Sequence, residues 1–175
     1  MREAVPVLNG QEEPTTDHPT FEGFVAARSP ALWRSAWLLT GDRHRAEDLV
    51  QTALMKCWRR WDRIEPAAVE AYVRRTMVTT YTDWWRRRWN GEVPTETLPE
   101  AADTARDPGV RQDVLVALAA LPRGQRAVVV LRYFDDLTEA QAAAALGISA
   151  GTVKSQTARA LRTLRTSGLL EATDD

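Results

Sequence analysis

The sequence predicts an all-α protein of two small helical domains joined by an acidic flexible linker, the second carrying a helix-turn-helix. Three observations predict this fold: apolar residues recur at helical spacing in the first half, a proline-bearing acidic stretch follows, and helix caps flank a glycine near the C-terminus. A length of 175 residues allows one mid-sized domain or two small ones. All seven tryptophans lie between Trp33 and Trp89, which favours two domains of different composition.

The domain boundaries follow from shifts in composition. Residues 1–19 are polar and poor in large apolar groups, so we expect a disordered tail. The first domain is predicted over residues 20–90 and the second over 108–168, followed by a short tail over 169–175. The segment of residues 91–107 contains five acidic residues, one basic residue and two prolines, which is typical of an extended linker.

The first domain begins with two predicted helices. Thr20 can cap a helix, Ser29-Pro30 allows a second start, and Gly41 ends the segment. Asp42 then opens the strongest helical pattern of the chain. Its apolar stripe follows i, i+3, i+4 spacing through Ala46, Leu49, Val50, Ala53, Leu54, Cys57, Trp58 and Trp61. The polar side of this helix is as consistent with a solvated face as with a docking surface.

A long helix is predicted from Pro66 to about Arg88. Its apolar stripe runs from Val69 to Trp84. Aromatic side chains lie beside arginines on the remaining surface, an arrangement that suits unpaired bases and phosphates, because stacking contributes about 1 to 3 kcal/mol per base. Core packing is the alternative for tryptophans in a small helical domain. We therefore assign Trp33, Trp37, Trp58 and Trp61 to packing and keep only Trp85 and Trp89 as base contacts.

Residues 137–165 have the order of a helix-turn-helix. Thr138 and Gln141 form a capping box, Gly147 supplies the left-handed turn, Ile148 is expected to plug it, and Ser149 caps the next helix. The second helix keeps a buried stripe of Val153, Ala160, Leu161 and Leu164. Its remaining faces carry four basic residues and no acidic residue between Ala150 and Arg165, as in a helix that reads the major groove. The alternative is an amphipathic hairpin with solvated arginines.

Charge and composition exclude several classes of protein. The net charge of -1 hides two cationic segments, the arginines of residues 71–90 and the last helix. The single Cys57 rules out an internal disulfide, and neither His18 nor His44, both read as surface residues, has metal-ligand spacing around it. We expect no metal, no cofactor and no catalytic activity, since no carboxylate cluster, histidine pair or phosphate-binding glycine loop is found. With no signal peptide or apolar span, a cytoplasmic location without membrane attachment is expected.

Five motifs in order resemble the extracytoplasmic-function sigma factors of bacterial RNA polymerase. They are Ala46-Glu47-Asp48-Leu49-Val50-Gln51, Tyr72-Val73-Arg74-Arg75, Leu121-Pro122 with Gln125-Arg126, Leu146-Gly147-Ile148-Ser149, and Gly151-Thr152-Val153-Lys154-Ser155. The resemblance covers residues 21 to about 165. It implies a non-catalytic subunit in which region 2 is the first domain and region 4 the second. The partners it implies are core RNA polymerase and promoter DNA, and it leaves room for an anti-sigma factor.

The resemblance also implies three binding surfaces. Region 2 would bind the clamp helices of the largest polymerase subunit through Asp48, Leu49, Gln51 and Lys56. It would read the minus-10 element as a single strand, with a flipped base in the loop of residues 62–69, through Asp62, Arg63, Arg75, Thr79, Thr82, Trp85, Arg86, Arg87 and Arg88. Region 4 would rest on the flap of the second-largest subunit and read the minus-35 duplex through Thr152, Lys154, Ser155, Gln156, Arg159 and Arg162.

Thr79 departs from the family pattern, which usually has asparagine there, and this leaves the preferred minus-10 base open. Two rival functions remain. A helix-turn-helix regulator that binds operators unaided would use residues 21–89 as a sensor or dimerisation domain and would bind duplex DNA tightly by itself. An enzyme acting on nucleic acid would need a catalytic cluster of the kinds named above.

Overall fold

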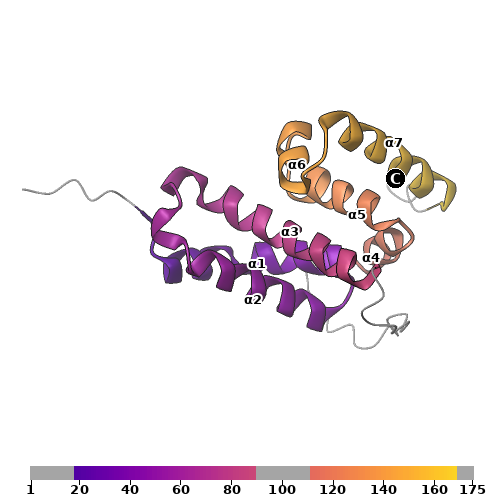
Figure 1. The fold of residues 1–175 in the computed structure, drawn as a ribbon. Helices are drawn as coiled ribbons and strands as arrows, with labels where there is room; N and C mark the ends of the chain where they lie inside the picture. Colours follow the sequence, from indigo (N-terminus) through magenta and orange to yellow (C-terminus); the bar gives the residue numbers. More distant parts are fainter. Residues whose placement is uncertain (1–17, 90–110, 169–175) are drawn as a thin grey trace, which may run out of the picture.

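The computed structural model describes residues 18–89 and 111–168, and all regular structure within these residues is helical. The first group comprises α1 (Phe21–Thr40), α2 (Arg43–Trp58), the 3-10 turns η1 (Trp61–Arg63) and η2 (Pro66–Ala68), and α3 (Val69–Trp89). The second group comprises α4 (Gln112–Ala119), α5 (Arg123–Val129), the π-helical turn η3 (Val130–Phe134), α6 (Glu139–Leu146) and α7 (Ala150–Thr166). Figure 1 shows the two groups as neighbouring bundles, with α7 on the side away from α1. The predicted linker, the C-terminal tail from residue 169 and residues 1–17 lie outside the described residues.

Helix α1 is continuous, so the second start predicted at Pro30 is wrong. Thr20 caps the helix as predicted, since its Oγ1 accepts a hydrogen bond from the Gly23 amide at 3.1 Å, and Gly41 ends it with φ 67°. An internal proline removes one helical hydrogen bond and crowds the preceding turn, at a cost of about 3 kcal/mol. Buried Phe24 and Leu32 lie on either side of Pro30, so α1 packs into the core on both sides of the proline. We infer that this packing outweighs the local cost.

The core of the first bundle follows the stripe predicted for α2. Ala46, Leu49, Ala53 and Cys57 are all within 1% of complete burial. The prediction that Trp58 packs in the core is wrong: 56% of this side chain is exposed, because it lies at the outer edge of the stripe.

Trp61 is buried at one end of this core and contacts the residues that precede α1. The Trp61 indole donates to the Pro19 carbonyl at 2.9 Å, and His18 Nε2 lies 2.9 Å from the Ile64 carbonyl oxygen. His18 is thus half-buried and hydrogen-bonded rather than a free surface residue. Residues 18 and 19, predicted to belong to the disordered tail, contact the folded domain.

The two bundles pack against one another along α3. Val78 is fully buried in a cluster with Val128, Leu131 and Val153 of the second bundle. Tyr81 is 3% exposed, and its hydroxyl donates to the Leu39 carbonyl at 3.0 Å. Neither side chain belongs to the apolar stripe expected for α3: Val78 is covered by the second bundle, where α6 packs on α3, whereas Tyr81 reaches back to α1. Figure 1 shows α5 and α6 lying over α3.

Candidate nucleic-acid interface

The helix-turn-helix has the local structure that the sequence predicts. Thr138 Oγ1 accepts from the Gln141 amide at 3.1 Å, and Gln141 Oε1 accepts from the Thr138 amide at 2.9 Å. Gly147 has φ 67°, and Ser149 Oγ accepts from the Thr152 amide at 3.0 Å to start α7. Ile148 was expected to plug the turn but is 37% exposed, so it only partly covers the turn.

Helix α7 presents a cationic surface. Val153, Ala160 and Leu164 are buried as predicted, while Leu161 is only half-buried. Lys154, Ser155, Arg159 and Arg162 are exposed, as duplex contacts require, and Thr152 and Gln156 are half-buried. The positive end of the α7 dipole coincides with the turn that carries Thr152, which favours contact with phosphate.

Thr152 and Gln156 face the first bundle. They line a cavity of about 190 Å³ together with Thr82 and Trp85 of α3. The Arg123 guanidinium at the start of α5 lies over the Trp85 ring, a cation–π contact. The half-buried Trp85 is therefore stacked on an arginine of the second bundle in this arrangement.

The candidate single-strand contacts of the first bundle are dispersed along α3 and the preceding turns. Arg75, Thr79, Arg86 and Arg87 are exposed, and Thr82 is half-buried. Nothing is described of the side chains of Arg88 and Trp89. Asp62 and Arg63 are exposed in η1, and the predicted loop of residues 62–69 is folded into η1 and η2 around buried Ile64. Any base bound there would meet a pre-formed surface.

On α2, the candidate polymerase contacts divide into exposed and buried residues. Asp48, Gln51 and Lys56 are exposed, and Lys56 Nζ also donates to Thr80 Oγ1 at 2.9 Å. The prediction that Leu49 contacts the polymerase is wrong. Leu49 is completely buried, because it belongs to the apolar stripe, and it offers no surface to a partner.

An apolar groove lies between α1 and α2 beside Gln51. It has a volume of about 710 Å³ and is lined by residues that include Phe21, Leu54, Met55 and Trp58. Met55 and Trp58 are 61% and 56% exposed. Large exposed apolar side chains grouped in this way are typical of a protein-binding surface.

Sequence reasoning missed the residues that join the bundles. Arg126, quoted only as part of a motif, is 8% exposed, and its Nε donates to the Leu38 carbonyl at 2.6 Å. Burial lowers the pKa of its guanidinium, and nearby Tyr81 acts in the opposite direction. Asp135 was not singled out at all, although it forms an ion pair with Arg74 at 2.7 Å. Its one sequence signal is its position between a helix and the capping box.

The fold and these surfaces define a two-domain helical DNA-binding protein with a C-terminal helix-turn-helix. Residues 24–91 match the family model for Sigma-70 region 2, and residues 111–164 match that for Sigma-70, region 4. The chain is 48% identical to the RNA polymerase sigma-E factor of Streptomyces coelicolor over 151 residues, covering 83% of this chain and 84% of that protein. It is 32% identical to the ECF RNA polymerase sigma factor SigE of Mycolicibacterium smegmatis over 158 residues, 84% of this chain and 61% of that protein. The chain belongs to the extracytoplasmic-function sigma factors of the sigma-70 family.

Solved structures show the same fold. The sigma factor RpoE of Bartonella quintana, crystallised with the anti-sigma factor NepR, superimposes with a TM-score of 0.62 at 28% identity and covers 89% of this chain and 98% of that one. CnrH, solved with the cytosolic domain of CnrY, gives a TM-score of 0.59 at 24% identity, covering 88% of this chain and 89% of that one.

Family membership gives the general function: the protein is a sigma factor for transcription initiation by RNA polymerase, with the promoter-recognition regions 2 and 4. This sets aside the regulator that binds operators unaided. Sigma factors act as transcription regulators rather than as catalysts. Among the described helices, none is both long and apolar enough to cross a bilayer.

Proposed function

We propose that region 4 reads the minus-35 element as duplex DNA through the first turns of α7. The observation that carries this proposal is the exposed cationic face of α7 behind a capped N-terminus, with Lys154 and Arg159 free of acidic neighbours on the same helix. Arginine and lysine contact phosphates and guanine edges, whereas Thr152, Ser155 and Gln156 are the candidates for reading other base edges.

Substituting α7 residues tests this reading. Arg159→Ala should weaken binding of the reconstituted holoenzyme to the minus-35 region. If one phosphate contact is lost, the negative slope of log K against log salt should become shallower by about 0.9. Arg165→Ala, a matched change farther from the N-terminus of α7, should have a smaller effect. The promoter would first be selected from random DNA with the holoenzyme. An unchanged minus-35 footprint for Arg159→Ala would contradict the proposal.

Region 2 is proposed to bind the minus-10 element as a single strand. Exposed Arg75, Thr79, Arg86 and Arg87 on α3, and Asp62 and Arg63 on η1, support this by offering charge and hydrogen-bonding groups along one domain. Arg88 remains a predicted contact on sequence grounds, and Thr82 and Trp85 become available when Trp85 is released from Arg123. Thr79 would influence which base is preferred.

The arginine run at the end of α3 is proposed to act in strand opening rather than in duplex binding. Replacing Arg86, Arg87 and Arg88 together by alanine should reduce opening, measured by fluorescence of 2-aminopurine in the minus-10 element, more than it reduces minus-35 binding. Arg111→Ala is the control, because Arg111 pairs with Asp113 at the start of α4 at 2.8 Å. Equal losses in opening and duplex binding would refute the division of labour.

Core RNA polymerase is the proposed partner of α2, through its clamp helices. Exposed Asp48 and Gln51 support this assignment, and the apolar groove beside Gln51, with Met55 and Trp58, supplies the buried area that a stable subunit contact needs. The flap of the second-largest subunit is the proposed partner of region 4. An anti-sigma factor belongs among the partners to be tested, since the RpoE relative was solved with NepR. These partners would place the protein in the cytoplasm.

A further inference from the structure

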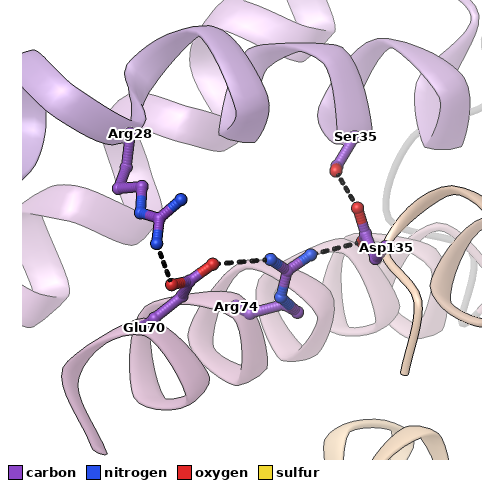
Figure 2. A network of polar contacts seen from close by, with 5 residues as sticks. All are labelled: Arg28, Ser35, Glu70, Arg74 and Asp135. Atoms are coloured by element: carbon purple, nitrogen blue, oxygen red, sulfur yellow. Dashed lines mark hydrogen bonds and ion pairs between the residues drawn. The ribbon is translucent and has the colours of Figure 1, made fainter. Parts of the chain in front are cut away.

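A cluster of five polar side chains joins region 4 to region 2. Asp135 Oδ1 accepts from Ser35 of α1 at 2.5 Å, and Asp135 Oδ2 forms an ion pair with Arg74 of α3 at 2.7 Å. Arg74 continues to Glu70 at 3.2 Å, and Glu70 to Arg28 at 2.6 Å. Figure 2 shows Asp135 alone coming from region 4, facing the other four residues. We call Ser35, Arg74 and Asp135 the interdomain latch.

The latch is well shielded from water. The Asp135 side chain is 7% exposed and that of Arg74 13% exposed, so their attraction is screened much less than that of a surface pair. The turn that presents Asp135 has an unusual shape: the Asp135 amide bonds to the Val130 carbonyl at 3.0 Å, and Asp136 follows with φ 53°. Asp135 is thus fixed by a π-helical turn and a left-handed residue, both uncommon in ordinary helix ends.

Arg126 makes a second junction at the C-terminus of α1. Its Nε donates to the Leu38 carbonyl at 2.6 Å, where the helix dipole is negative and the last carbonyls lack helical partners. Among the described residues, Arg126 Nη2 is buried without a hydrogen-bond partner. Burial of an incompletely bonded guanidinium costs free energy, so this junction stabilises the closed arrangement less than a fully bonded arginine would.

This closed arrangement restricts part of the surface proposed to read DNA. A recognition helix must enter the major groove with its first turns, yet Thr152 and Gln156 share a cavity of only about 190 Å³ with Thr82 and Trp85. Trp85 is in turn stacked beneath Arg123. Two predicted duplex contacts, Thr152 and Gln156, therefore lie against two predicted single-strand contacts, Thr82 and Trp85, while the basic residues of α7 stay exposed.

We propose that the interdomain latch holds the free sigma factor in a partly autoinhibited closed state, and that separation of Asp135 from Ser35 and Arg74 exposes Thr152 and Gln156 of α7 together with Trp85 of α3. The proposal rests on the proposed role of α7 in reading duplex DNA. A ligand that binds only the open state sees an affinity reduced by the fraction of open molecules. Weakening the latch therefore raises the affinity of the free chain for duplex DNA.

Ser35→Ala is the most informative variant, because Ser35 lies in region 2, far along the chain from α7. Asp135→Ala tests the region 4 side. Each should raise the affinity of the full-length free chain for the selected minus-35 duplex, by about tenfold if the open fraction rises tenfold. Ser29→Ala, the same change on α1, and Asp113→Ala, whose carboxylate pairs locally with Arg111, are matched controls expected to leave affinity unchanged.

A distance measurement checks the opening itself. Spin labels at Ala27→Cys on α1 and Ala144→Cys on α6 lie on exposed positions, and Cys57 is fully buried and so protected from labelling. Electron–electron double resonance should give one short distance in the otherwise unchanged chain. A longer population should appear in the Ser35→Ala and Asp135→Ala backgrounds, and on adding the duplex to the chain with an intact latch.

The outcomes separate the two proposals. If both latch variants keep the original distance and the original affinity while Arg159→Ala weakens binding, the latch proposal fails and the proposed reading by α7 stands. If Arg159→Ala has no effect on duplex binding, the proposed function of α7 fails. A rise in affinity from Ser35→Ala, a region 2 substitution, supports transmission through the contact between the domains.

Discussion

At the scale of single residues, Gly41 and Gly147 show how one backbone requirement can serve two purposes. Both have φ 67° and end a helix, a conformation that costs other residues about 1 kcal/mol. At Gly147 an added Cβ meets nothing within 4 Å, whereas at Gly41 it would lie 3.1 Å from Arg126 Nη2. Gly41 therefore both ends α1 and leaves room for the arginine of the other domain.

The matched pair Gly41→Ala and Gly147→Ala separates these roles. Both should lower the free energy of unfolding by about 1 kcal/mol through backbone strain, and Gly41→Ala should lose more because Arg126 must shift. Urea denaturation followed by circular dichroism measures the two losses. Equal losses would show that Arg126 moves aside without cost.

His18 gives the docking of the N-terminal residues a pH dependence. Hydrogen bonds to the Ile64 and Pro19 carbonyls raise its pKa above the ordinary value of 6.5, since the charged ring donates from both nitrogens. Its contribution to stability is complete below about pH 6.5 and is lost as pH rises through the folded-state pKa. The difference in melting temperature between the native chain and His18→Gln should thus shrink from pH 5.5 to 8.5. A constant difference would contradict this account.

At the scale of elements, α1 shows tertiary packing overriding a local signal. Ser29-Pro30 resembles a helix start, but the helix passes through it because Phe24, Leu32 and Leu39 all reach the core. Helix α7 shows the opposite case: Ser149 defines where the helix starts, and basic residues with no acidic residue among them define its exposed face. Local signals are decisive where the tertiary contacts agree with them.

Removing the proline of α1 tests this interpretation. Pro30 is exposed, so Pro30→Ala should restore a helical amide and raise the free energy of unfolding by about 2 kcal/mol, less than the full proline penalty because the unfolded chain also gains freedom. Pro66→Ala, at the first position of η2 where proline is favoured, should be neutral or slightly destabilising. Stabilisation of similar size at both positions would show that Pro30 is not strained.

At the scale of the whole molecule, the two domains share a core. Val78 belongs to region 2 by sequence but packs with Val128, Leu131 and Val153 of region 4. A polar and incompletely bonded contact around Arg126 lies beside this apolar one. Under the latch proposal, the apolar contact holds the two domains together, and they separate when a partner binds the open state more tightly than the closed state.

Val78→Ala should destabilise both domains together. The substitution removes buried methyl groups at a cost of about 2 kcal/mol. All seven tryptophans lie in region 2, so their fluorescence follows that domain while circular dichroism follows both. Both transitions should shift together for Val78→Ala, whereas Val73→Ala, inside region 2, should shift the fluorescence transition first. Unaltered region 4 unfolding in Val78→Ala would disprove the shared core.

The sequence by itself determined the helical fold class, the helix-turn-helix and the family. These depend on short-range features: Thr138 and Gln141 satisfy each other's amides, and the stripe from Ala46 to Cys57 repeats with the helical period. The minus-35 candidates on α7 could be predicted for the same reason. Their use in DNA reading is still a prediction.

Only the tertiary structure decided which face of α3 is covered and that Asp135 meets Arg74 and Ser35. Polar residues such as these carry no periodic signal, because a charged side chain reads as solvated until its partner is known. Their pairing is settled by the packing of distant helices, where burial makes a matched partner necessary.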